Sequence, residues 1–212
     1  MSQSDEVWVM CGGTSAANTL TVTDDVIAVN KDVFRYPNAK YFITIDNRFS
    51  VWEFSGKESN IPKTPTKIFV ANIAPSYMKF DKSLCDTRFA MSYNLSYYDM
   101  VIKSRRVDGG FGTTFNDFRS GGNSGFCAVQ LALLLGYKNI HIVGLDLCSR
   151  FGKTHHHEGY TNSRDNFDAC LENYRRAFKE ALQSYKHRFP NQTLINHSPI
   201  SYLKEFLGYT EL

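Results

Sequence analysis

The chain lacks the long apolar run that a membrane-spanning helix requires. Its longest strongly apolar stretch, Ala128 to Leu135, is far shorter than the roughly 20 residues needed to cross a bilayer. The first six residues contain neither a basic segment nor an apolar run, so no secretory signal is expected. We therefore expect a cytoplasmic protein without a membrane span.

Cysteine pairs are also missing. The chain has five cysteines, an odd number, and no C-x-x-C motif. Cys11, Cys127 and Cys148 lie in apolar segments, where a thiol packs as a small core residue. Reduced thiols in a reducing compartment are the simplest interpretation. A chain of this length can bury a core that needs neither a disulfide nor a structural metal.

No large excess of charge of either sign is present. The 212 residues include 24 Lys and Arg against 21 Asp and Glu, a net charge of +3, with 42% hydrophobic and 21% charged residues. This composition is ordinary for one globular domain covering residues 1–212. The mild basicity does not by itself indicate nucleic acid, but it is compatible with a site for anionic phosphates.

Short apolar segments alternate with helical patterns along the chain. Six segments predict strands, at 7–11, 26–30, 41–46, 67–72, 140–146 and 193–196. Helices are predicted over Ser124–Leu135, Asn162–Arg188 and Ile200–Leu207, the last begun by Ser198-Pro199. This alternation predicts an α/β fold, a mostly parallel open sheet flanked by helices, Rossmann-like. The segment around 80–120 has no clear period, and we expect an irregular insertion there that carries part of the substrate site.

The familiar phosphate-binding motifs, G-x-G-x-x-G and the Walker A loop, are absent. Instead, the first strand runs into the turn Gly12-Gly13-Thr14-Ser15. Glycines let the backbone approach a phosphate closely, and the following N–H groups and hydroxyls can bind it. A plain strand-to-helix turn with a Ser or Thr cap is the alternative.

A second glycine turn, Gly121-Gly122-Asn123-Ser124-Gly125, opens the predicted buried helix. The start of a helix presents free N–H groups and the positive end of its dipole to an anion. A flexible linker followed by a helix cap is the alternative here. Two glycine turns that each enter a helix favour a ligand with phosphate and sugar groups.

Polar residues follow three more of the predicted strands: Asn30, Asp46 and Asp146. In open parallel sheets, ligands bind beyond the carboxyl ends of the strands. We therefore predict one nucleotide-binding edge. Its residues are Gly12, Gly13, Thr14, Ser15, Asn30, Asp46, Asn123, Ser124, Gly125 and Asp146.

A histidine run, His155-His156-His157, follows the Asp146 strand. Adjacent residues cannot all bind one ion, and no second ligand pattern supports a metal site. A single histidine acting as general base suits the near-neutral pKa of imidazole. The flanking Gly152 and Gly159 indicate a lid that closes on substrate. A metal site and a plain polar loop are the alternatives.

The basic residues of the middle segment form a local cluster of Lys103, Arg105 and Arg106, with Arg119 further on. They could neutralise a phosphate or an acidic acceptor. Solvated loop charges are the alternative.

The stretches Gly122–Ala132, Leu135–Ile140 and Val143–Asp146 resemble two related groups. One is the MptE-like (DUF115) family, which includes 6-hydroxymethylpterin diphosphokinases. The other is the family 42 bacterial sialyltransferases, with a variant GT-A type of fold. The glycine turn after the first strand, Asn30 after the second, and the close at Ile195–Ser198 are similar to these groups too.

The resemblance implies roles for the predicted residues. By the sialyltransferase pattern, Gly13, Ser15, Asn30, Ser124 and Gly125 would hold a cytidine-nucleotide sugar. His156 or His157 would then deprotonate the acceptor hydroxyl, with Tyr160 as a candidate lid tyrosine and no required cofactor. By the diphosphokinase pattern, the same turns would hold ATP, with Asp46 or Asp146 near Mg²⁺.

The leading hypothesis is therefore a nucleotide-sugar-dependent glycosyltransferase with a lid histidine as general base. The alternatives are a Mg-ATP-dependent diphosphokinase and a non-catalytic nucleotide-binding module. A nucleotide or nucleotide sugar is the expected partner. The acceptor stays open between a glycan, a small molecule and a modified DNA base, and so does the formation of homo-oligomers.

Overall fold

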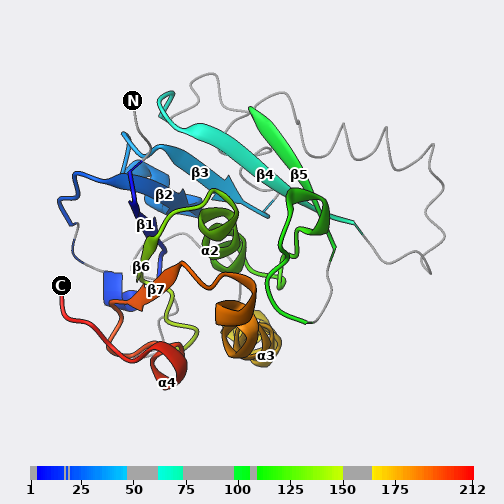
Figure 1. The fold of residues 1–212 in the computed structure, drawn as a ribbon. Helices are drawn as coiled ribbons and strands as arrows, with labels where there is room; N and C mark the ends of the chain where they lie inside the picture. The colour runs from blue at the N-terminus through cyan, green and yellow to red at the C-terminus, as the bar shows by residue number, and fades with distance from the viewer. Residues whose placement is uncertain are drawn as a thin grey trace.

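The described residues form a seven-stranded parallel sheet with helices packed against it (Figure 1). The structure, a computed structural model, describes residues 4–16, 18, 20–46, 62–73, 98–105, 109–149 and 164–212. The strands are β1 (Glu6–Met10), β2 (Asp25–Val29), β3 (Tyr41–Thr44), β4 (Thr66–Ile73), β5 (Met100–Arg105), β6 (Asn139–Val143) and β7 (Thr193–Asn196). Their order is β5-β4-β3-β2-β1-β6-β7, and each neighbouring pair is parallel. The predicted α/β fold with a parallel sheet is confirmed.

The strand order reverses at β1. The chain runs outward from β1 through β2, β3 and β4 to the edge strand β5, then returns to β6 on the other side of β1. Such a reversal leaves a crevice between the segments that follow the two central strands, because their connections depart in opposite directions. The carboxyl ends of β1 and β6 are therefore the place where this fold can bind a ligand.

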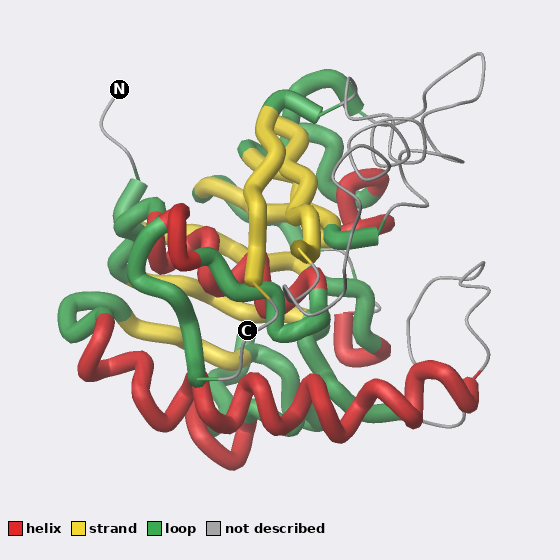
Figure 2. The backbone as a smooth tube through the Cα atoms, turned by 90° about the vertical axis from the view of Figure 1, so that its right-hand side faces the viewer, coloured by secondary structure: helices red, strands yellow, loops and turns green. Residues whose placement is uncertain are grey.

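Helix α2 (Ser124–Leu134) covers the middle of one face of the sheet and contacts β1, β2, β3 and β6. Nearly all of its residues are buried, which explains its apolar sequence. Helix α3 (Arg164–Arg188) is amphipathic and runs along one side of the sheet (Figure 2). Helix α4 (Lys204–Leu207) lies near the C-terminus. None of the described helices is both long and apolar enough to cross a bilayer.

Alternate strand residues point to opposite faces of the sheet and supply two separate cores. Val7 and Val9 of β1 belong to the core under α2 and α3, where Phe126 and Phe178 meet edge to face. Met10 belongs to the core on the other face, which is covered by short 3-10 helices. These include η1 (Thr14–Ala16) and η2 (Asn30–Phe34).

Two elements differ from their predictions. Part of the segment expected to be irregular around 80–120 is the edge strand β5, which pairs with β4 from Met100 to Arg105. The last helix is shorter than predicted and begins at Lys204, not at Ile200. Ser198 consequently does not cap it. The Ser198 hydroxyl instead contacts Ser15, in η1.

Candidate functional site

The glycine turn after β1 is bound directly to the end of β6. The Gly13 N–H donates to the Gly144 carbonyl at 2.8 Å, continuing the β1–β6 pairing. A Cβ at Gly13 would stand 2.4 Å from that same carbonyl oxygen, so no other residue fits here without displacement. Gly13 therefore lets two strand ends approach each other. The sequence analysis expected Gly13 to let the backbone come close to a phosphate. Close contact with a phosphate and close contact between strand ends both require a residue without a side chain.

A buried carboxylate organises this turn. Asp146, 3% exposed, accepts from the Ser15 N–H at 2.9 Å and from the Thr14 hydroxyl at 3.3 Å on one oxygen. Its other oxygen accepts a short hydrogen bond from the Ser15 hydroxyl. The structure thus brings together Thr14, Ser15 and Asp146, and both carboxylate oxygens are engaged by the protein.

Ser198, just beyond β7, braces the same turn, whereas the sequence assigned it only to the start of the last helix. Its hydroxyl lies 2.7 Å from the Ser15 hydroxyl and accepts from the Gly144 N–H at 3.0 Å. Ser198 is completely buried. The rule that singled out Asn30 and Asp146, a polar residue just beyond a strand, would also have found it, since Ser198 follows β7 closely.

The second glycine turn leads into α2 beside the first. Asn123 caps the helix by accepting from the Phe126 N–H at 3.1 Å, while the Ser124 hydroxyl accepts from the Ile45 N–H at 3.2 Å. A Cβ at Gly125 would stand 2.5 Å from a Leu145 methyl and 3.4 Å from the Cys11 sulfur. The start of α2 is therefore packed against the ends of β1 and β6, as the prediction of one shared edge requires.

The ends of β2 and β3 carry Asn30 and Asp46. Asn30 adopts a left-handed conformation, with φ of 54°. Among the described residues its Oδ1 is buried and makes no hydrogen bond. Asp46 is partly exposed, and its N–H donates to the Thr44 hydroxyl at 2.9 Å. A buried acceptor without a hydrogen-bond partner is uncommon in folded proteins.

Asp32 and Arg35 of the neighbouring turn were not predicted. The Arg35 guanidinium donates to the Ala16 carbonyl at 2.6 Å and to Asp32 at 3.3 Å, which joins η2 to η1. Burial raises the pKa of the Asp32 carboxyl to about 6, although Arg35 acts in the opposite direction. Burial also raises the pKa of the Cys11 thiol, with Asp32 and Asp146 adding to the effect. Cys11 is therefore an uncharged packing residue, as expected.

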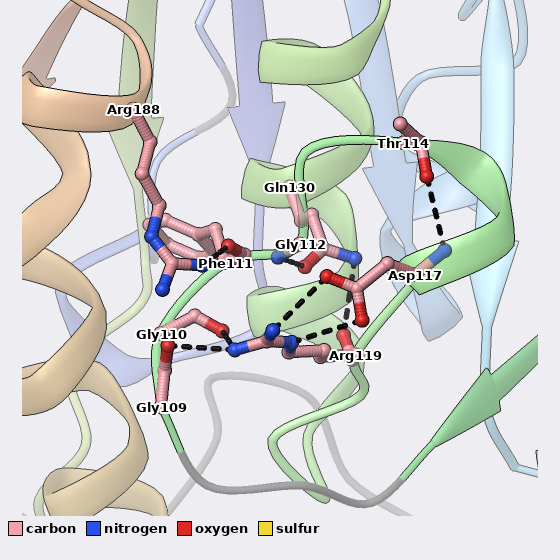
Figure 3. Close-up of polar contacts among 9 residues, drawn as sticks. All are labelled: Gly109, Gly110, Phe111, Gly112, Thr114, Asp117, Arg119, Gln130 and Arg188. Carbon is pink, nitrogen blue, oxygen red and sulfur yellow. Dashed lines mark hydrogen bonds and ion pairs between the residues drawn. The ribbon is translucent and has the colours of Figure 1, made fainter.

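Arg119 is held by the protein around it (Figure 3). Its guanidinium donates to the Gly109 carbonyl at 2.6 Å and to the Asp117 carboxylate at 3.0 Å. Buried Gln130 of α2 accepts from the Gly112 N–H at 2.6 Å and donates to the Arg119 carbonyl at 3.2 Å. These hydrogen bonds hold in place the 109–119 segment, which directly precedes the second glycine turn. Contact of Arg119 with phosphate stays a prediction.

The remaining predicted residues lie outside the described residues. They are His155, His156, His157, Tyr160 and Arg106; Arg105 is described only as part of the backbone of β5. Within the part of the chain that is described, no group of three or more His, Cys, Asp or Glu side chains could hold a metal ion.

The fold and the site define a Rossmann-like α/β domain with a glycine turn at its topological switch point. No family model matches the chain, and no curated protein matches it. Several solved structures do match the chain. The sialyltransferase CstII from Campylobacter jejuni, in complex with cytidine-5′-monophosphate, is 14% identical with a TM-score of 0.55, over 99% of this chain and 86% of that one.

Two further structures from Campylobacter jejuni give the same result. CstII in complex with the substrate analogue CMP-3FNeuAc is 12% identical with a TM-score of 0.54, over 96% of this chain and 85% of its own. The monofunctional alpha-2,3-sialyltransferase Cst-I is 13% identical with a TM-score of 0.58, over 97% and 80%. At these identities the similarity shows a shared fold. The resemblance to sialyltransferases is confirmed at that level, and the resemblance to the MptE-like family stays a prediction.

Proposed function

We propose that this protein is a glycosyltransferase that takes a sugar from a nucleotide donor, most simply a cytidine nucleotide. One observation carries the proposal. In a fold shared with CMP-bound sialyltransferases, the turn at Gly12–Ser15 follows β1 at the switch point of the sheet, and the turn at Gly121–Gly125 ends where Gly125 lies against Cys11 and Leu145, just beyond β1 and β6. This is the place where the fold can accept a nucleotide.

Each group at this edge has a chemical use toward a nucleotide. The start of α2 offers a positive dipole end and backbone donors to the phosphate. The buried Oδ1 of Asn30 offers an acceptor to an N–H or O–H of the nucleoside. Asp146 acts indirectly, because its carboxylate holds the Ser15 turn in place.

The transfer itself balances without a metal. The bond between the anomeric carbon and the nucleotide phosphate breaks, and the phosphate leaves with the electron pair. The acceptor oxygen bonds to the anomeric carbon and gives its proton to a general base. We assign that base to His156 or His157 on sequence grounds, since imidazole accepts a proton near neutral pH.

The diphosphokinase alternative receives less support from the geometry. It needs carboxylates that face Mg²⁺. Both oxygens of Asp146 are instead hydrogen-bonded to Thr14 and Ser15. Asp46 is the remaining predicted ligand, and one carboxylate with substrate phosphates is a minimal magnesium site.

A nucleotide screen tests the proposal. We expect CMP to stabilise the protein without metal, by about 2.7 kcal/mol at a concentration 100 times its Kd. For a chain of this size, that free energy corresponds to a rise in melting temperature of roughly 5–10 °C. The measurement is a thermal-shift series with CMP, UMP, GDP and ATP, each with and without Mg²⁺. Stabilisation by ATP only, and only with Mg²⁺, would favour the diphosphokinase instead.

The base is tested separately by His156→Ala and His157→Ala. Whichever substitution removes the base should lower the turnover of a nucleotide-sugar donor by about a hundredfold or more, while CMP binding stays unchanged. His187→Ala, at an exposed position in the last turn of α3, is the matched control. Full turnover in both lid variants would remove these histidines from the mechanism.

A further inference from the structure

A chain of hydrogen bonds crosses the second face of the sheet, away from α2. Glu6 of β1 contacts His141 of β6 at 2.7 Å, and the other nitrogen of His141 contacts His197 at 2.8 Å. The second nitrogen of His197 lies 2.8 Å from the Thr210 carbonyl of the C-terminal tail. The Trp8 ring stacks on both imidazoles, with centroid distances of 4.3 and 5.2 Å.

This chain needs one proton more than its neutral members supply. The Glu6 carboxylate and the Thr210 carbonyl at its two ends only accept hydrogen bonds. Three hydrogen bonds between them therefore require three protons, and two neutral imidazoles carry two. The third proton makes one imidazole an imidazolium opposite the Glu6 carboxylate.

His141 is the imidazole that contacts the Glu6 carboxylate, and His197 is the more buried of the two. Burial lowers the pKa of His197, and His141 acts in the same direction, against the opposing effect of the Thr210 carbonyl. The pKa of Glu6 is lowered by its hydrogen bond from Asn139 and by His141, against burial and the nearby Asp5. Asp5 is itself paired with Lys138 at 2.7 Å.

The tail is tied to the residues that precede Ser198. Asn196 donates to the Gly208 carbonyl at 2.9 Å and accepts from the Thr210 N–H at 2.9 Å on its own carbonyl. The Ser198 N–H donates to the Asn196 side chain at 3.1 Å. The tail clasp, formed by Asn196, His197, Gly208 and Thr210, thus adjoins the serine that braces the Ser15 turn.

We propose that the C-terminal tail is a proton-dependent brace for the nucleotide-binding turn: one proton shared by His141 and His197 closes the tail clasp, and its loss frees the tail and loosens Ser198. The closure of the clasp stands on its own geometry. Its effect on nucleotide binding rests on the proposed function.

The sign of the pH dependence follows from the proton count. The folded protein holds the extra proton, so the clasp is complete at mildly acidic pH. It is lost as pH rises through the range in which imidazolium loses its proton, ordinarily near 6.5. The lowered pKa of Glu6 sets the acidic limit of the pH range in which the clasp is closed. Its contribution is present above the ordinary value of 4.5 and is lost as pH falls through a folded value below it.

Hydrogen exchange of the Thr210 amide, followed by NMR from about pH 5 to 8.5 without nucleotide, measures the clasp directly. We expect its protection factor to fall by about tenfold as pH rises, because one hydrogen bond of the chain is lost. In Glu6→Gln, the new amide donates to His141 and still accepts from Asn139. Three bonds then form with two neutral imidazoles, so protection should no longer depend on pH.

Exposed Glu205→Gln on α4 is the control and should keep the wild-type profile. A flat wild-type profile, or the same slope in Glu6→Gln as in the wild type, would overturn the clasp.

The CMP affinity of wild type and Glu6→Gln, measured by calorimetry at pH 5.5 and 8.5, tests whether the clasp affects nucleotide binding. Because the phosphate of CMP also titrates, the two proteins are compared at each pH, and Glu6→Gln should bind more tightly than wild type at pH 8.5. Equal affinities would overturn the coupling, whereas no binding of CMP by either protein would reject the proposed function and leave the clasp intact.

Discussion

Gly144→Ala should lower the free energy of unfolding by about 4 kcal/mol, combining a disfavoured backbone with a direct collision. Gly144 has φ of 70°, in the left-handed region that L side chains rarely adopt. A Cβ there would stand 2.0 Å from the Cys11 carbonyl oxygen and 2.6 Å from the Ala16 Cβ. Both neighbours belong to the segment around the first glycine turn, so relief of the collision must displace that turn. Urea unfolding measures the loss, and CMP stabilisation should disappear with it.

Substitutions at two other glycines separate the cost of the left-handed backbone from the cost of the steric collision. Gly136, after α2, has φ of 84°, and a Cβ at this position would meet nothing within 4 Å, so Gly136→Ala should cost only about 1 kcal/mol. Gly13 shows the collision without a left-handed φ, and Gly13→Ala should cost about 2 kcal/mol. A loss at Gly144 no larger than the loss at Gly136 would mean that the two strand ends can separate freely.

The common edge of Gly13, Asn30 and Asp146 could be predicted because parallel strands end together. Gly13, Asn30 and Asp146 are each a polar or glycine residue beyond an apolar strand. The structure places all three at carboxyl strand ends on one side of the sheet. This inference needs only the direction of the strands, which the alternation of strand and helix patterns indicates.

The partners of those residues could not be predicted in the same way. The contact between Ser15 and Ser198 joins positions 183 residues apart. It depends on β6 lying between β1 and β7, and local sequence periodicity does not predict the order of strands in a sheet. The left-handed conformation of Leu147, with φ of 52°, also follows no local sequence rule.

Strand β5 was missed for a different reason. Its sequence, Met100-Val101-Ile102-Lys103-Ser104-Arg105, has only three apolar residues and lies in a polar stretch. As an edge strand, it leaves Met100 and Val101 exposed and buries Ile102 and Ser104. The buried positions alternate, but one is a serine whose hydroxyl donates to the Ala71 carbonyl at 3.2 Å. A search for alternating apolar residues misses a strand whose buried face includes a hydrogen-bonded serine.

Asp146→Ala should cost about 3–5 kcal/mol of unfolding free energy and abolish CMP binding, because it removes a charged acceptor from three donors. The Ser15 N–H, the Ser15 hydroxyl and the Thr14 hydroxyl all donate to this one carboxylate, which is 3% exposed. The backbone N–H cannot turn toward another acceptor without moving the turn itself. Chemical denaturation and calorimetry with CMP measure the two losses.

Asp146→Asn decides what the carboxylate is for. An amide of the same shape can accept from the Ser15 N–H on its oxygen and donate to the Ser15 hydroxyl, which in turn donates to Ser198 at 2.7 Å. If Asp146 organises the turn, the asparagine variant should stay within about 1 kcal/mol of wild type and retain CMP binding. If Asp146 binds Mg²⁺, asparagine loses the charge that holds the ion and should fail as completely as alanine in metal-dependent ATP binding. Because the amide can satisfy the same groups without a charge, we expect the first result.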